Sequence, residues 1–268
     1  MVGLGAVALS IWLLYHELRG ISVADLEESF AAISMRGWAL ACASTFAAYA
    51  ALAGYDHIAL MHLRRKISPV FVTLTSFTAY ALAHNIGASV FSGAVVRYRA
   101  YSSRGLTTAE IGVLVAFCSF TFALGTLFLT GLVLLVEPGI LERFVDMLPL
   151  EASATTGVAL LTLVALYVLG SWLHLKPLKI GGFELQYPRL PIVARQLLIG
   201  PVELAAAAAI VYFALPKAGN PGYPVVLGIF MISFSIALIS HAPGGIGVLE
   251  LAFINGLADM DEADVLAA

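Results

Sequence analysis

Long runs of apolar residues, each about the length of one membrane crossing, dominate the chain. A helix needs about 20 predominantly apolar residues to cross the hydrocarbon core of a bilayer. The segments that reach or approach this length are 1–15, 37–61, 70–96, 111–136, 154–173, 196–215 and 224–258. The pattern therefore predicts an all-α polytopic integral membrane protein with about six to eight membrane helices.

The last apolar segment, 224–258, is too long for one crossing and too short for two crossings joined by a loop. A proline and several glycines interrupt it, namely Pro243, Gly244, Gly245 and Gly247. Non-helical backbone at membrane depth survives only where it is buried in protein or faces a water-filled cavity. We therefore expect a helix, a break at 241–247 and a second helix that starts near Val248.

A sequence repeat relates this break to an earlier segment. Residues 77–87 (FTAYALAHNIG) and 234–244 (FSIALISHAPG) share a Phe, a hydroxyl residue, an aliphatic residue, a His and a Gly, at an offset of 157 positions. Transporters built from repeats place paired broken helices at a site near the bilayer midplane. We therefore expect one or two broken or re-entrant helices in an inverted repeat. The residues expected at the breaks are His84, Asn85, Gly87, His241, Pro243, Gly244, Gly245 and Gly247.

The distribution of Lys and Arg predicts the orientation of the chain. The loops 62–66, 97–104 and 176–195 are basic, whereas 137–151 is acidic. Cytoplasmic loops carry the excess of Lys and Arg, so 97–104 and 176–195 are expected inside and 137–151 outside. Whether 62–66 joins the inner loops depends on whether the segment after it re-enters or crosses fully, and the sequence leaves both open.

Residues 21–34 alternate polar and apolar positions at helical spacing between the first two apolar segments. Ser22 followed by Asp25 resembles a capping box. The segment is predicted to be either an amphipathic helix on the membrane surface or an ordinary connecting helix.

Composition narrows the class of protein further. The chain has 268 residues, of which 60% are hydrophobic and 12% are charged, against about 25% charged in soluble domains. This balance excludes a soluble enzyme and a disordered chain, and the net charge of −3 offers no basic field for nucleic acid. Cys42 and Cys118 lie in apolar runs, so we expect neither a disulfide framework nor a metal site.

Ionisable residues inside apolar segments are the candidate functional residues, because each costs several kcal/mol at membrane depth. These are Asp56, Arg97, Glu203 and Glu250, with Arg99 close by. A structural ion pair or an interfacial position is the alternative interpretation for each. His84 and His241 could carry protons or could cap backbone carbonyls. No motif for a catalytic nucleophile, nucleotide, metal or cofactor is present, so any transport would use a gradient or be passive.

Four motifs resemble a known family. They are GYDHIAL (54–60), GAVVRYRAY (93–101), PVELAAAAAIVYF (201–213) and HAPGGIGVLE (241–250). They are similar to the N-terminal flippase domain of the multiple peptide resistance factor, the bacterial aminoacyl-phosphatidylglycerol synthase and flippase. The same domain recurs in a stand-alone family, the lysylphosphatidylglycerol synthase transmembrane-region class.

The resemblance implies a single transmembrane flippase-type domain over 1–268 in a bacterial inner membrane. It places Asp56, Arg97 and Glu203 at functionally important positions and Glu250 at the acidic position after the glycines. The family has more glycine before the arginine than this chain, and it continues with a further helix and a soluble aminoacyltransferase domain. We therefore expect a piece without the lysyltransferase active site, truncated at its C-terminus.

The function implied is movement of lysyl-phosphatidylglycerol to the outer leaflet, which confers resistance to cationic peptides. Its head group carries two ammoniums and one phosphate, which acids and Arg97, with Arg99, could bind. Three alternatives stay open: a docking subunit that holds phosphatidylglycerol for the synthase, a carrier of another lipid such as a polyprenyl phosphate, and a proton-coupled solute transporter. A homodimer is compatible with the sequence, which names neither the aminoacyl group nor the energy source.

Overall fold

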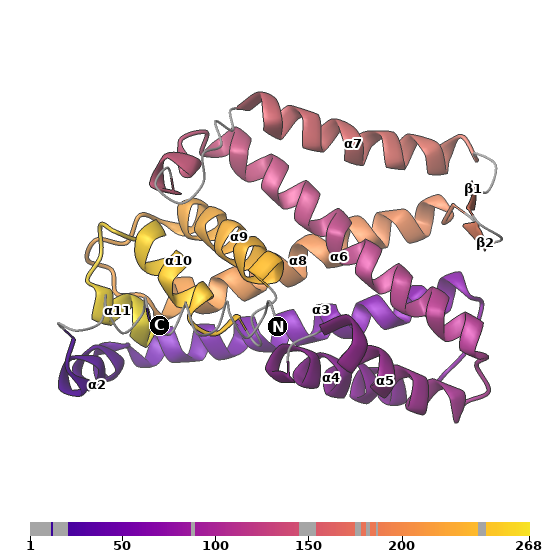
Figure 1. Cartoon of the computed structure of the whole chain (residues 1–268), viewed down its shortest axis with the longest axis horizontal. Coiled ribbons are helices and arrows are strands. Elements are labelled where there is room, and N and C mark those ends of the chain that lie inside the picture. The colour runs from indigo at the N-terminus through magenta and orange to yellow at the C-terminus, as the bar shows by residue number, and fades with distance from the viewer. Residues whose placement is uncertain are drawn as a thin grey trace.

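The computed structural model describes residues 12, 21–86, 89–144, 154–174, 178–180, 183–185, 187–240 and 245–268. Its first half contains α2 (Val23–Ala32), α3 (Met35–His62), α4 (Pro69–Ile86), α5 (Ser89–Ser102), α6 (Thr108–Val136) and the short 3-10 helix η2 (Ile140–Phe144). Its second half contains α7 (Ala154–Trp172), β1 (Leu178–Ile180), β2 (Phe183–Leu185), α8 (Leu190–Ala214), α9 (Tyr223–Ser240), α10 (Val248–Gly256) and α11 (Glu262–Ala267). The described chain is helical apart from the antiparallel β1–β2 hairpin (Figure 1).

The predicted class is confirmed. Among the described residues, five helices are long and apolar enough to cross a membrane, namely α3, α6, α7, α8 and α9. Residues 69–83 form a shorter apolar helix within α4. The expected span at 1–15 lies outside the described residues except for Trp12. The expected capping box is present, because the Ser22 and Asp25 side chains each accept a backbone N–H of the other residue.

Helices α4 and α5 form an antiparallel hairpin, so the segment 70–96 re-enters and does not cross. The Phe71 and Tyr101 rings lie 6.3 Å apart near the open end, where the Arg104 guanidinium also lies 4.2 Å from the Phe71 ring. At this open end, Arg65 Nε of the loop before α4 lies 2.7 Å from Glu110 Oε1 in the first turn of α6. The basic loops 62–66 and 97–104 therefore share one face, and the β1–β2 hairpin of the third basic loop lies on the same side in Figure 1. We call this face the inner end because of its positive charge.

A second hairpin, made by α9 and α10, opens toward the opposite face. The Phe230 and Phe253 rings lie 6.4 Å apart, and a Cβ on Gly256 would lie 2.6 Å from Ile229. Arg143 of η2 donates to the Gly256 carbonyl at its open end. Helix α10 begins at Val248, as predicted. We call this face, which carries α2, η2 and α11, the outer end; it lies at the left of Figure 1.

The two hairpins belong to an inverted repeat. A shift of 157 positions carries α3, α4 and α5 onto α8, α9 and α10 within a few residues at every bound. Helices α3 and α8 pack antiparallel, since Gly37 meets the Phe213 carbonyl at one end and Gly54 meets Ile199 further along. The elements of the second half therefore run in the opposite direction through the membrane, as inverted-topology repeats do.

Glycine allows α6 and α8 to cross in backbone contact. A Cβ on Gly125 would lie only 2.7 Å from the Gly200 carbonyl carbon, closer than side chains approach. Small residues permit such close packing of membrane helices. The crossing brings α6 against both α3 and α8, which are the helices that carry the buried carboxyl groups.

Candidate functional site

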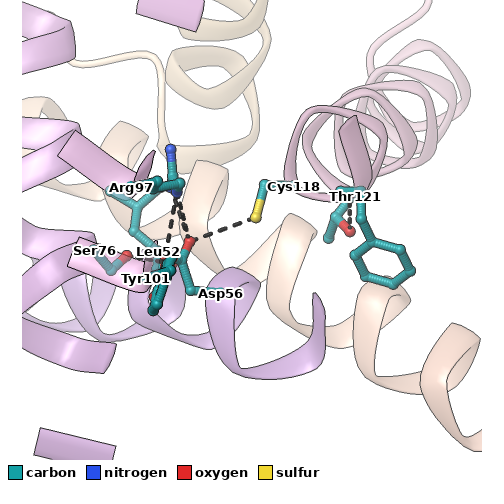
Figure 2. Close-up of polar contacts among 8 residues, drawn as sticks. Leu52, Asp56, Ser76, Arg97, Tyr101, Cys118 and Thr121 are labelled. Atoms are coloured by element: carbon teal, nitrogen blue, oxygen red, sulfur yellow. Dashed lines mark hydrogen bonds and ion pairs between the residues drawn. The ribbon is translucent and has the colours of Figure 1, made fainter. Parts of the chain in front are cut away.

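A buried ion pair joins the first hairpin to α3. Asp56 of α3 is 0% exposed and Arg97 of α5 is 5% exposed. The Arg97 guanidinium donates through Nη2 to Asp56 Oδ1 at 2.8 Å and through Nε to both carboxylate oxygens at 3.1 and 3.2 Å (Figure 2). The structure therefore brings together two residues that the sequence analysis had selected separately.

Three neighbours complete the environment of this pair. The Tyr101 hydroxyl donates to Asp56 Oδ2 at 2.6 Å, and Cys118 Sγ of α6 lies 3.5 Å from Oδ1. The Arg97 guanidinium carbon lies 4.6 Å from the centre of the Tyr80 ring. The negative charge of Asp56 is thus matched by a cation and by further donors, as buried charges require.

The hairpin is also fixed to α3 by a neutral contact. The Ser76 hydroxyl of α4 donates to the Leu52 carbonyl of α3 at 3.0 Å, one turn before Asp56. This carbonyl already belongs to the backbone ladder of α3, so the hydroxyl finds a buried partner without breaking the helix. The contact sets the depth of α4 along α3 and so places α5 with its arginine.

Glu203 lies in a different environment, between α8 and α3. It is 7% exposed, and the Tyr55 hydroxyl donates to its Oε2 at 3.3 Å. Among the ion pairs of the described residues, Glu203 takes part in none. A carboxylate buried without a cation is costly, so this group needs either a proton or a cationic ligand.

Another polar chain crosses from α6 to α7 through α8. The Gln196 amide nitrogen donates to Thr121 Oγ1 at 2.9 Å, and the Tyr167 hydroxyl donates to Gln196 Oε1 at 2.8 Å. All these groups are neutral and paired. The chain stabilises the packing of the three helices and offers no free charge.

Glu250 has a local structural partner. Its Oε2 accepts the backbone N–H of Gly247 at 2.7 Å and closes the first turn of α10. Gly245 and Gly247 have φ angles of 72° and 79°, a left-handed conformation that favours glycine. These contacts agree with the alternative interpretation of Glu250 as a structural residue, and they leave a role for it in binding untested.

The remaining candidates are less informative. Arg99 is exposed in the last turn of α5. The backbone of His84 and Asn85 belongs to α4, but their side chains lie outside the described residues. Also outside them are Gly87, His241, Pro243 and Gly244.

The sequence analysis missed several residues of the site. Tyr55 and Tyr101 lie inside the motifs that carried the family resemblance, next to Asp56 and one helical turn after Arg97, so the signal was present. Cys118 gave none, because it stands in an apolar run. Its sulfur lies beside the Asp56 carboxylate.

Comparison with known proteins identifies relatives of the chain. No model of a known protein family matches it. It is 30% identical over 251 residues to uncharacterized protein slr0712 of Synechocystis sp., which covers 93% of this chain and 77% of the relative. It is also 31% identical over 210 residues to inner membrane protein YbhN of Escherichia coli, which covers 76% of this chain and 63% of that relative.

These similarities extend over most of the helices described above and agree with the membrane-spanning architecture. The name of the Escherichia coli relative places that protein in the inner membrane. The basic end of this chain is the end expected to face the cytoplasm in such a membrane. The chain is a multi-pass inner-membrane protein, and it belongs to the same family as slr0712 of Synechocystis.

Proposed function

We propose that this chain is a lipid translocase domain of the lysylphosphatidylglycerol synthase transmembrane-region class. It moves aminoacylated phosphatidylglycerol, with lysyl-phosphatidylglycerol as the simplest substrate, from the inner to the outer leaflet. The resemblance of four motifs to that class supports the proposal, and so does the pair of hairpins that open toward opposite faces. Paired discontinuous helices of this kind surround the substrate site of many transporters.

The observation that carries the proposal is the uncompensated charge of Glu203. Asp56 and Arg97 neutralise each other, so the buried ionisable groups Asp56, Arg97 and Glu203 sum to one negative charge when all are ionised. The lysyl-phosphatidylglycerol head group has two ammoniums and one phosphate and therefore one net positive charge. Substrate and site together are neutral, whereas phosphatidylglycerol, which is anionic, would add a second negative charge.

An exchange of ion pairs would bind the head group without leaving a bare charge. The lipid phosphate replaces Asp56 on the Arg97 guanidinium, which suits the planar geometry of that group. One ammonium then pairs with Asp56 and the other with Glu203. In this scheme the pair seen between Asp56 and Arg97 is the state without substrate, and Glu203 selects for the additional amine.

Reconstitution into liposomes tests the proposal. Vesicles contain lysyl-phosphatidylglycerol in both leaflets, and a membrane-impermeant amine reagent counts the inner-leaflet lipid that becomes exposed with time. We expect exposure that depends on the protein and is lost in Glu203→Gln. The matched control is Glu28→Gln, which removes one acid from the exposed surface of α2 and should translocate normally.

Two outcomes would contradict the proposal. Exposure no faster than in empty vesicles, with binding of the lipid retained, would indicate a docking domain for a synthase. Equal exposure of phosphatidylglycerol, or of a polyprenyl phosphate followed with its own probe, would show that the amine is not recognised and that the substrate is another lipid.

A further inference from the structure

A cavity of about 560 Å³ lies at the outer end, away from the buried carboxyl groups. It is bounded by α2, the first turns of α3, the end of α8 with the loop that follows, and α11. Polar residues that line it include Ser29, Arg36, Tyr212, Lys217, Asn220 and Asp264. Its volume falls within the range of about 300–1,000 Å³ that is typical of small-molecule sites.

The charges of the cavity differ from those of the surface around it. The described acidic residues of the outer end are Asp25, Glu27, Glu28, Glu137, Glu142, Asp259, Asp261, Glu262 and Asp264. The described basic residues there are Arg36, Arg143 and Lys217. Arg143 pairs with Asp259 at 2.8 Å, whereas Arg36 and Lys217 form no ion pair within the described residues. Among the described residues, the two outer cations without an acidic partner therefore both line one cavity.

The depth of the cavity in the membrane indicates which leaflet would supply its ligand. Phe30 of α2 and Trp38 of α3 are exposed, and their rings pack edge to face at 4.9 Å beside the cavity. An exposed tryptophan is typical of the boundary between the hydrocarbon core and the head groups. A ligand bound to Arg36 and Lys217 would then lie at the depth of the outer-leaflet phosphates.

We propose that this cavity is a binding site for the head group of an anionic phospholipid of the outer leaflet. The phosphodiester lies between Arg36 and Lys217, and arginine binds phosphate oxygens in a bidentate manner. Asp264 of α11, which is half-buried and also lines the cavity, accepts a hydrogen bond from a hydroxyl of the same head group. The site is separate from that of the proposed translocation, and its test requires no lipid movement.

Quenching of Trp38 by brominated lipids measures occupancy of this site. In a Trp12→Phe/Trp172→Phe background, Trp38 is the remaining tryptophan, because the chain has three. The chain is placed in vesicles that contain brominated phosphatidylglycerol or brominated phosphatidylcholine. We expect phosphatidylglycerol to quench at an about tenfold lower mole fraction, since one charge-assisted contact gives about this factor.

The double variant Arg36→Gln/Lys217→Gln should lose this preference. The matched control is Arg64→Gln/Lys66→Gln, which removes the same charge from exposed positions of the inner end and should keep it. Equal quenching by both lipids in the unchanged chain, or an unchanged preference in the double variant, would overturn the proposal. Displacement of brominated phosphatidylglycerol by millimolar glycerol phosphate or inorganic phosphate would show a site for soluble anions and would also overturn it.

Discussion

Two buried carboxyl groups lie on neighbouring helices of the same chain, and their surroundings are opposite. Asp56 accepts hydrogen bonds from Arg97 and Tyr101 and lies beside Cys118. Glu203 accepts one hydrogen bond, from the neutral Tyr55 hydroxyl. Both groups are equally visible in the sequence as acids in apolar segments. Burial of an acid therefore does not by itself identify a binding group, because Asp56 already has its cation, whereas Glu203 needs a proton or a cationic ligand.

The largest effect on stability is expected when the ion pair between Asp56 and Arg97 is broken. Arg97→Gln leaves Asp56 buried without a cation, and the loss of one partner from a buried pair costs about 3–5 kcal/mol. We expect the free energy of unfolding, measured by denaturant titration in detergent, to fall by about this amount. Arg99→Gln removes the same charge two residues along α5 from an exposed position and should be nearly neutral. Similar losses in the two variants would show that the pair does not stabilise the fold.

An intermediate effect on stability is expected where the tyrosine hydroxyl that donates to each buried carboxyl group is removed. Tyr101→Phe removes a short donor to a charged acceptor and should cost about 1.5–3 kcal/mol of unfolding free energy. Tyr55→Phe removes the longer contact to Glu203 and should cost about 0.5–1.5 kcal/mol, as a neutral hydrogen bond does. Denaturant titration measures both losses of unfolding free energy. A larger loss in Tyr55→Phe than in Tyr101→Phe would show that Glu203, and not Asp56, depends more on its tyrosine.

A smaller effect on stability is expected at Glu203 itself. Glu203→Gln keeps a hydrogen-bond acceptor for Tyr55 and removes an uncompensated buried charge, so the unfolding free energy should change by less than about 1 kcal/mol. Asp56→Asn is the contrasting variant, because it leaves Arg97 unpaired and should destabilise strongly. If Glu203→Gln destabilised as much as Asp56→Asn, an additional cation would have to bind Glu203 in the folded chain.

The smallest effect is expected at the exposed ion pair of the inner end. The Glu110 carboxylate raises the pKa of the Arg65 guanidinium, through a hydrogen bond first and charge attraction second. Both side chains are solvent-accessible, and water screens such pairs. Glu110→Gln should therefore leave thermal unfolding unchanged within error in high salt. A marked loss of stability would show that closure of the α4–α5 hairpin depends on this pair.

The sequence predicted the helices well because apolar length and glycine breaks are local signals. The offset of 157 positions, seen in only a short repeat, describes three consecutive helices of each half. The repeat pointed to a broken or re-entrant helix at 70–96 and left a full crossing open. The choice depends on the contact between Arg65 and Glu110, which are distant in sequence and meet only in the folded chain.

The residues of the site could be predicted from the sequence, but which of them are partners could not. Asp56 and Arg97 were each selected for the cost of a charge at membrane depth, but the packing of α4 on α3 and of α5 on α4 and α6 makes them partners. Glu250 shows the reverse case. Its spacing from Gly247 is that of a capping residue three positions into a helix, so its local contact could have been predicted from the sequence.

The adjacency of Tyr55 and Asp56 has a consequence for communication between the two carboxyl sites. Successive residues of an α-helix point about 100° apart around its axis. A rotation of α3 that reorients Asp56 toward a new partner therefore also reorients the Tyr55 hydroxyl relative to Glu203. Such a rotation would link the two sites thermodynamically, and the factor by which a ligand at one site changes the affinity of the other would be the same in both directions.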